Sequence, residues 1–232
     1  EDRKEGVAIR RRVGFVGEDK GLYDYARVGQ MIAFTRSFFP DWDRELEERL
    51  IELFELPLRR SIRKLSKGTR TKLALLLALP RRADLLVLDE PTEGLDPAIK
   101  EDVLQILVGL AAGGATIFFS SHQLNEVEQI ADHISIIERG RLVVHGVLDE
   151  LKENYRRIHM VFDEEAPELA LAAIGATPFR RGERSLTVYV ERDVETIVDQ
   201  AYLHNAVTVE VAPVTLKEIF LECARSRAGE AE

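Results

Sequence analysis

A chain of 232 residues can form one large domain or two small ones. Its net charge of −9 argues against a nucleic-acid partner, and its single cysteine, Cys223, excludes an internal disulfide and suits a reducing compartment such as the cytoplasm. The longest apolar run, Leu73–Leu79, is far shorter than the ~20 residues that span a bilayer. We therefore expect any membrane association to come through a partner.

The first half of the chain is expected to begin with a strand at Val13–Val16, which ends in Gly17 and Glu18. Amphipathic and apolar helices follow and should form a helical subdomain over about residues 25–80. These helices are expected at residues 27–39, at 44–56 and, after a polar turn, at 73–79. Glu18 by itself is better explained as a solvated loop acid than as a ligand.

The polar turn before the third helix reads Leu65-Ser66-Lys67-Gly68-Thr69. Ser66 is a predicted helix cap, and Gly68 allows a close backbone approach. A helix N-terminus entered through such a turn can bind an anion. The alternative is a capped core helix that binds nothing, and the turn alone favours that alternative.

The stretch from Leu85 to Asp96 is the most informative part of the sequence, because an apolar run ends abruptly in Asp89 and Glu90. A buried parallel strand has this pattern where its carboxyl end opens into a ligand crevice. Acids placed there can hold Mg²⁺ and activate water against a phosphate. The alternative is a core strand that runs into an acidic turn, and Asp96 before Pro97 is also an ordinary helix start.

A third apolar run, Ala115–Phe119, ends in Ser120-Ser121-His122. In an open parallel sheet the carboxyl ends of the strands lie side by side, so His122 and the acids of the other two runs should converge. Taken singly, His122 is equally a helix residue without chemistry. The neighbouring elements are expected to be helices at residues 97–112 and 123–131, and a hairpin at residues 134–145.

The remainder, residues 151–232, has a different pattern, and we expect a domain boundary between it and residues 1–150. Its predicted order is βαββαβ, which is compatible with a small ferredoxin-like sandwich, followed by a helix that Thr215 caps. We expect strands at residues 158–162, 178–180, 186–190 and 207–211, and helices at residues 167–174, 194–203 and 215–224. For this domain we expect no more than an accessory role, either regulatory or dimer-stabilising.

Taken in order, these motifs resemble the nucleotide-binding domain of ABC transporters, with bacterial exporter-like ATPases as the nearest type. The resemblance covers about Val7 to Gly146 and implies a partial P-loop NTPase-type α/β domain. The matching segments are Gly14–Glu18 at the Q-loop position, Leu65–Thr69 as the signature loop, Leu85–Glu90 as the Walker B strand, Glu93–Asp96 as the D-loop and His122 as the switch histidine.

The resemblance implies that the chain takes part in ATP hydrolysis with Mg²⁺ as the metal. Asp89 would hold Mg²⁺ through water, and Glu18 would be a second metal-binding candidate. Glu90 would polarise the attacking water, and His122 would contact the γ-phosphate. Glu18 carries charge where the family usually has a glutamine amide, which weakens its assignment.

The resemblance also implies partners. Ser66, Lys67, Gly68 and Thr69 would bind ATP held by a second ATP-binding subunit, and Asp96 would lie at the dimer interface. Lys67 and Thr69 depart from the usual Leu-Ser-Gly-Gly-Gln signature. A transmembrane permease subunit would place the protein at the inner face of the cell membrane. Its coupling helix would meet the helical subdomain, where Tyr23 and Trp42 are the open candidates, and Phe34, Phe38 and Phe39 are expected to pack into the core.

The phosphate-gripping pattern Gly-x-x-x-x-Gly-Lys-[Ser/Thr] does not occur in the sequence. Positioning and charge stabilisation are most of phosphoryl-transfer catalysis. We therefore expect that the chain is a fragment lacking the first part of the nucleotide domain and is inactive alone, while the parent protein is an ATPase. The alternatives are a non-catalytic dimerisation or interaction module and an ABC-type ATPase not linked to transport.

Overall fold

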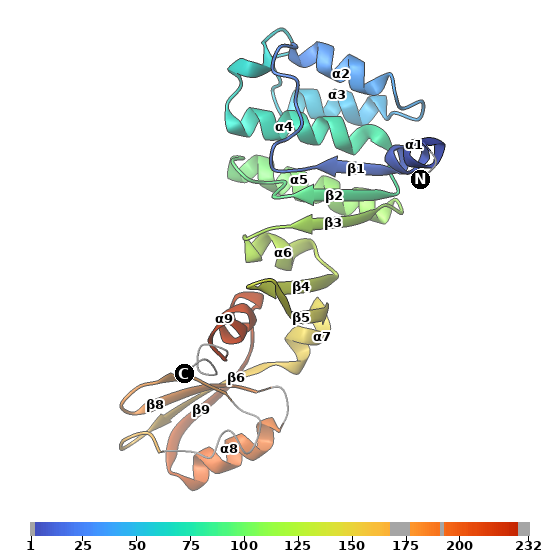
Figure 1. Cartoon of the computed structure of the whole chain (residues 1–232). Helices are drawn as coiled ribbons and strands as arrows, with labels where there is room; N and C mark the ends of the chain where they lie inside the picture. Colours follow the sequence, from blue (N-terminus) through green and yellow to red (C-terminus); the bar gives the residue numbers. More distant parts are fainter. Residues whose placement is uncertain (1–2, 168–176, 191–192, 227–232) are drawn as a thin grey trace. The chain divides into compact units, whose positions relative to one another are not determined.

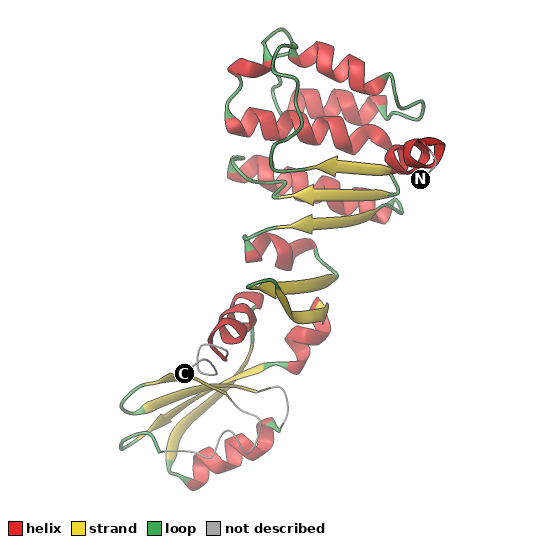
Figure 2. Ribbon diagram, viewed as in Figure 1, coloured by secondary structure: helices red, strands yellow, loops and turns green. Residues whose placement is uncertain are grey.

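A computed structural model describes residues 3–167, 177–190 and 193–226, and it divides into two compact units, residues 1–122 and 123–232 (Figure 1). Each unit combines helices with its own β-structure (Figure 2). The boundary expected at residue 150 stays a prediction. No helix in the described ranges has the length and apolar character needed to cross a membrane.

The first unit is built on a three-stranded parallel sheet in the order β1-β2-β3. Its strands are β1 (Val13–Val16), β2 (Leu85–Asp89) and β3 (Thr116–Ser120). All three strands were predicted, and only the third is displaced, by one residue. The register pairs Val16 with Leu88 and Asp89 with Ser120, so the three carboxyl ends meet at one edge of the sheet.

The two faces of this sheet differ in what covers them. Val16, Leu86 and Leu88 are buried on one face, where helix α4 comes close to β1. On the other face the register places Phe15, Val87 and Phe118 in one row, and Phe15 and Phe118 are 64% and 66% exposed. The described residues therefore leave an apolar sheet face uncovered, and β3 has a hydrogen-bonded strand on one side only.

The helices of the first unit follow the predicted order, with shorter bounds for two of them. They are α1 (Arg3–Arg12), α2 (Val28–Arg36), α3 (Arg44–Leu53), η1 (Ile62–Lys64), α4 (Lys67–Ala78), η2 (Leu79–Arg81) and α5 (Pro97–Ala112). The α5 bounds agree with the prediction, whereas no helix was predicted at the position of α1.

A buried carboxylate joins two helices of this helical subdomain. Glu47 on α3 accepts hydrogen bonds from Arg36 Nη1 of α2 at 2.7 Å and from Trp42 Nε1 at 2.6 Å. Glu47 is only 4% exposed, so these partners compensate the cost of burying its charge. Trp42 is buried as well, which removes it from the candidates for an exposed interface anchor.

The second unit contains a hairpin and a four-stranded antiparallel sheet in the order β7-β8-β6-β9. This strand order is that of the predicted ferredoxin-like arrangement. The predicted helix at residues 167–174 lies mostly outside the described residues. The elements are α6 (Leu124–Ile130), β4 (His133–Glu138), β5 (Arg141–Val147), α7 (Leu148–Asn154), β6 (Arg156–Phe162), β7 (Thr177–Arg181), β8 (Ser185–Val190), α8 (Val194–Leu203), β9 (Ala206–Pro213) and α9 (Leu216–Ser226).

The hairpin β4-β5 shares a hydrophobic core with helix α9. Ile134, Ile136 and Leu148 are buried together with Leu216 of α9. The start of α9 is fixed by a reciprocal cap, in which Thr215 N donates to Glu218 Oε2 at 2.8 Å and Glu218 N donates to Thr215 Oγ1 at 3.3 Å. This cap is the one predicted from the sequence.

Candidate functional site

The candidate site begins at the end of β2, where Asp89 meets the end of β3. Ser120 Oγ donates to Asp89 Oδ1 at 2.5 Å, and Lys20 Nζ donates to the Asp89 carbonyl at 3.5 Å. The parallel register places Asp89 directly opposite Ser120, which explains the contact. Ser120 thus fixes the direction of the Asp89 carboxylate.

Glu90, the next residue, has an unusual backbone conformation. Its φ of +46° lies in the left-handed region, which costs a residue other than glycine about 1–3 kcal/mol. The Glu90 amide donates to the carbonyl and to the hydroxyl of Ser120, each at 3.2 Å, and Glu93 N donates to the Glu90 carbonyl at 3.2 Å. These bonds hold Glu90 in place where the strand turns away from the sheet.

The Glu90 side chain reaches the residue that follows β3. Its Oε1 lies 2.9 Å from His122 Nδ1 and also accepts from the His122 amide at 3.0 Å. A carboxylate is only an acceptor, so His122 Nδ1 is the donor in this contact. Glu90 Oε2 is buried and has no hydrogen-bond partner in the described part of the chain. The predicted convergence of Asp89, Glu90 and His122 is confirmed.

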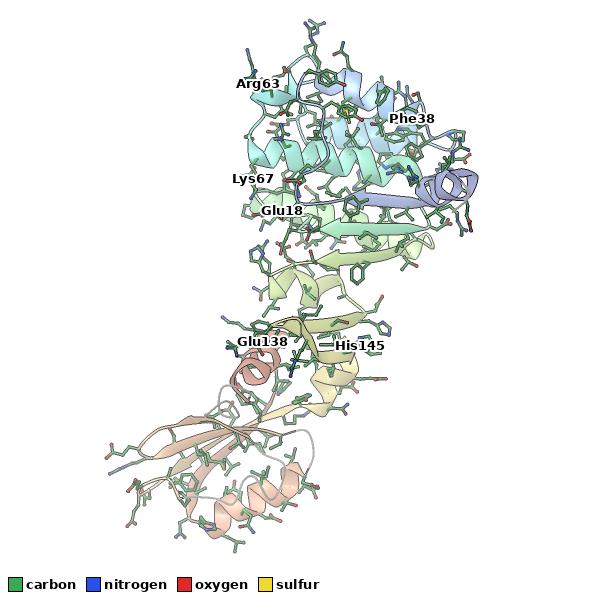
Figure 3. All side chains as sticks on the ribbon, in the orientation of Figure 1. Glu18, Phe38, Arg63, Lys67, Glu138 and His145 are labelled. Carbon is green, nitrogen blue, oxygen red and sulfur yellow. The ribbon has the colours of Figure 1, made fainter. Side chains whose placement is uncertain are left out.

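The turn before α4 forms the second half of the candidate site. Ser66 caps the helix, because its Oγ accepts from Thr69 N at 3.2 Å and lies 2.8 Å from Thr69 Oγ1. Lys67 and Gly68 form the first turn of α4. In Figure 3 Lys67 and Glu18 are both on the side of the first unit toward which the strands of its sheet point. The predicted cap is confirmed, whereas the predicted ATP contacts of this turn stay a prediction.

An ion pair connects this turn with the segment that follows β2. Lys67 Nζ lies 2.6 Å from Glu93 Oε1. The hydrogen bond from Lys67 lowers the pKa of Glu93 from its usual value, and the positive charges of Lys67, Lys20 and His122 act in the same direction against the effect of burial. Glu93 is therefore a carboxylate at neutral pH.

Two predicted site residues lack contacts that would assign them a role. Glu18 is exposed after β1 and forms no hydrogen bond or ion pair with the described residues. Asp96 occupies the N-cap position of α5, but its side chain makes no capping bond. The described ranges contain no group of three or more His, Cys, Asp or Glu side chains that could hold a metal. The predicted roles of Glu18 and Asp96 stay predictions.

Sequence reasoning gave no role to Ser120 or to the ion pair between Lys67 and Glu93. Ser120 was visible as a hydroxyl at a strand end, but only the register shows that it meets Asp89. Lys67 was noted as a departure from the family signature. Its partner lies 26 residues away, and no local pattern connects the two positions.

An exposed aromatic cluster lies on the helical subdomain. Tyr23 stacks on Tyr25 with ring centroids 5.7 Å apart and meets the edge of Phe34 at 6.2 Å, and Phe34 lies 4.9 Å from Phe38. All four residues are exposed, and Tyr25 is 85% exposed. The expectation that Phe34 and Phe38 pack into the core is therefore wrong, because both are exposed, with Phe34 packed on Tyr23 and Phe38 packed on Phe34.

Comparisons with known proteins agree with the fold and motifs. The sequence profile described as "AAA domain, putative AbiEii toxin, Type IV TA system" matches residues 10–128. The chain is 31% identical over 163 residues to the ABC transporter ATP-binding protein YtrB of Bacillus subtilis, an alignment that covers 70% of this chain and 56% of that protein. It is 30% identical over 225 residues to the Nod factor export ATP-binding protein I of Cupriavidus metallidurans, covering 92% of this chain and 73% of that protein.

A solved structure supports the fold. The dimeric post-hydrolysis structure of the ATP-binding cassette MJ0796, bound to ADP and Pi, matches with a TM-score of 0.56 at 21% identity and covers 64% of this chain and 68% of that chain. The chain spans little more than half the length of YtrB. By sequence and by fold, the chain belongs to the family of ABC transporter ATP-binding proteins.

Proposed function

We propose that the chain is the catalytic and coupling part of an ATP-hydrolysing subunit that powers transport through a membrane partner. The observation that carries this proposal is the 2.9 Å contact between Glu90 Oε1 and His122 Nδ1, at strand ends where Ser120 also fixes Asp89. A carboxylate, an imidazole and a second carboxylate at neighbouring strand ends can serve as general base, phosphate contact and metal ligand in nucleotide hydrolysis.

Each residue has a distinct role in this proposal. Glu90 accepts a proton from the attacking water, and its buried, unpartnered Oε2 supports that role. The imidazole of His122, held by Glu90, contacts the γ-phosphate. Asp89 binds Mg²⁺ through water, and Glu18 is a weaker candidate because no contact orients its carboxylate. Mg²⁺ commonly takes one or two carboxylates together with water and substrate phosphates, which fits a site without a three-ligand cluster.

A phosphate-binding segment has to complete this site. None of the 232 residues forms the lysine-containing phosphate loop, so nothing in the chain grips the triphosphate in front of Glu90. The uncovered sheet face with Phe15 and Phe118, and the open edge of β3, supply a surface on which such a segment can pack. We propose that the chain alone neither binds ATP tightly nor hydrolyses it.

We also propose that two such subunits bind ATP between them. Ser66 and Gly68 would bind the γ-phosphate of ATP held by the other subunit, in a turn that also contains Lys67 and Thr69. Asp96 would lie at the interface between the two subunits. The exposed N-terminus of α4 supports this assignment, since the positive end of a helix dipole favours an anion. The related cassette MJ0796 was solved as a dimer with ADP and Pi.

The membrane partner is proposed to bind the aromatic cluster on the helical subdomain. Exposed aromatic side chains bury large apolar areas and commonly anchor protein interfaces. Tyr23, Tyr25, Phe34 and Phe38 form one continuous patch of this kind. A transmembrane permease bound there would place the protein at the inner face of the membrane. The name of the Nod factor export relative supports export as the direction of transport.

The test is phosphate release by the complete protein that carries this sequence together with its phosphate-binding segment. The Glu90→Gln variant should lose activity by a factor of about 100 or more, the usual contribution of a positioned base, and should accumulate as an ATP-bound dimer. Glu48→Gln, which changes an exposed glutamate of α3, serves as the matched control. If ATP hydrolysis persists in Glu90→Gln, Glu90 is not the catalytic base. If the isolated chain hydrolyses ATP in a Glu90-dependent way, no further phosphate-binding segment is needed.

A further inference from the structure

The turn that carries Glu90 is held against the N-terminal part of α4 by three contacts. The first is the ion pair between Lys67 Nζ and Glu93 Oε1 at 2.6 Å. The second is a hydrogen bond from Thr71 Oγ1 to the Glu93 carbonyl at 3.3 Å, made by a residue that is fully buried. The third is a backbone contact so close that a Cβ on Gly68 would lie 2.4 Å from the carbonyl oxygen of Gly94.

The fastened turn leads directly back to Glu90. Glu93 N donates to the Glu90 carbonyl at 3.2 Å, and Leu95 N donates to the Thr92 carbonyl at 3.2 Å. Thr92 and Leu95 are both buried, so this turn is a compact unit rather than a loose loop. A displacement at Glu93 therefore reaches the backbone that sets the conformation of Glu90.

We propose that Lys67 is a positioning residue, whose ion pair with Glu93 clamps the Glu90–Leu95 turn to the N-terminal turn of α4 so that the two move as one unit. The proposal deepens the proposed function and rests on it for its catalytic consequence. In a dimer, engagement of the α4 turn by a phosphate would be transmitted to Glu90 within the same subunit. Gly68 and Thr71 supply the contact surface, and Lys67 supplies an ionic link.

A direct role for Lys67 on a phosphate makes a different prediction. In the clamp, the two charges matter only as an opposite pair, so exchanging them preserves the link. In direct phosphate binding, a positive charge is needed at position 67 itself, because a glutamate there repels the phosphate. The double variant Lys67→Glu/Glu93→Lys therefore distinguishes the two roles.

Amide hydrogen exchange in the chain itself tests the clamp without ATP. Lys67→Met should raise the exchange rates of the Glu93 and Leu95 amides by roughly two- to fivefold, the range that corresponds to a partly exposed ion pair. Lys67→Arg should retain the wild-type rates. Lys64→Met is the matched control, since Lys64 is exposed close to the same turn and forms no ion pair with the described residues. Equal rates in Lys67→Met and the wild type would overturn the proposal.

Turnover in the complete protein tests the consequence at Glu90. The clamp predicts that Lys67→Met lowers kcat more than it raises KM for ATP. It also predicts that the charge-exchanged double variant recovers both amide protection and kcat relative to Lys67→Glu. The proposal would be overturned by a double variant whose amide exchange is as fast, and whose kcat is as low, as in Lys67→Glu. A wild-type protein that does not hydrolyse ATP would refute the proposed function, while the exchange rates would still decide whether the clamp exists.

Discussion

Replacing Gly68 by alanine is the sharpest perturbation of the contact between the two turns. The added Cβ would lie 2.4 Å from the carbonyl oxygen of Gly94, about 1 Å short of an ordinary contact at 3.4 Å. Neither side can yield by rotating a side chain, since both the Gly68 Cα and the Gly94 carbonyl belong to the backbone. The two turns must therefore separate, and the turn that ends at Leu95 must move with them.

Two opposing contributions set the change in the free energy of unfolding caused by Gly68→Ala. Alanine is favoured over glycine in a helix by up to about 1 kcal/mol. Overpacking a close contact costs about 1–3 kcal/mol. We therefore expect Gly68→Ala to lower the free energy of unfolding by about 0–2 kcal/mol. Gly109 in α5 has no atom within 4 Å of the position of a Cβ, so Gly109→Ala should raise that free energy by up to about 1 kcal/mol.

Urea unfolding followed by tryptophan fluorescence measures both variants. Trp42 is the only tryptophan of the chain and is buried in the first unit, so its emission reports on the unit that contains both glycines. The midpoint of Gly68→Ala should lie below that of Gly109→Ala, with a difference of about 1–3 kcal/mol in the free energy of unfolding at an unchanged slope. Equal stabilisation by both alanines would show that Gly68 and Gly94 are not in close contact, and the clamp would lose its backbone component.

Three further predictions follow from the described contacts. Glu47→Ala should lower the free energy of unfolding by about 2–4 kcal/mol in urea melts followed by circular dichroism, because it leaves buried partners of a carboxylate unpaired; a change under 1 kcal/mol would contradict the network. The pKa of the Glu93 carboxyl should be lower than usual by NMR titration, so the stabilisation from its ion pair is present at neutral pH and is lost as pH falls through that lowered pKa; Lys67→Met should return the pKa toward its ordinary value, and no shift would argue against the pair. Tyr25→Ser and Phe34→Ser should leave stability within about 0.5 kcal/mol but reduce co-purification with the permease, and unchanged co-purification would exclude the aromatic cluster as the docking surface.

The sequence predicted the elements of the first unit correctly where the hydrophobic pattern and the Gly and Pro residues at its ends agree. The observed bounds of β1 and α5 match the predicted ones. The apolar run of β1 is bordered by Gly17, and the apolar helix face of α5 lies between Pro97 and Gly113. Helix α2 ends at Arg36, before the predicted end, and Ser37 Oγ binds the carbonyl of Phe34 there. Such local side-chain bonds compete with the helix and leave no periodic signal.

The aromatic residues show the limit of hydrophobic pattern more clearly. Trp42 is buried because the carboxylate of Glu47 accepts its indole N–H, a partner that hydrophobicity does not reveal. Phe34 and Phe38 are equally apolar, yet both are exposed; Phe34 packs on Tyr23, which precedes α2, and Phe38 packs on Phe34. Some aromatic side chains are therefore buried and others exposed, because burial depends on neighbours from other elements.

By itself, the sequence determined that Asp89, Glu90 and His122 stand at the carboxyl ends of two strands, and that these ends converge if the strands are parallel. That inference needs only chain order and the direction of each strand. Only the tertiary structure decided that Ser120 bonds Asp89, that Glu90 bonds His122, and that Lys67 pairs with a glutamate in a different turn. The physical reason is that hydrogen bonds and ion pairs require atoms within about 3 Å, and for residues far apart in the chain that separation is set by strand register and helix packing rather than by local sequence.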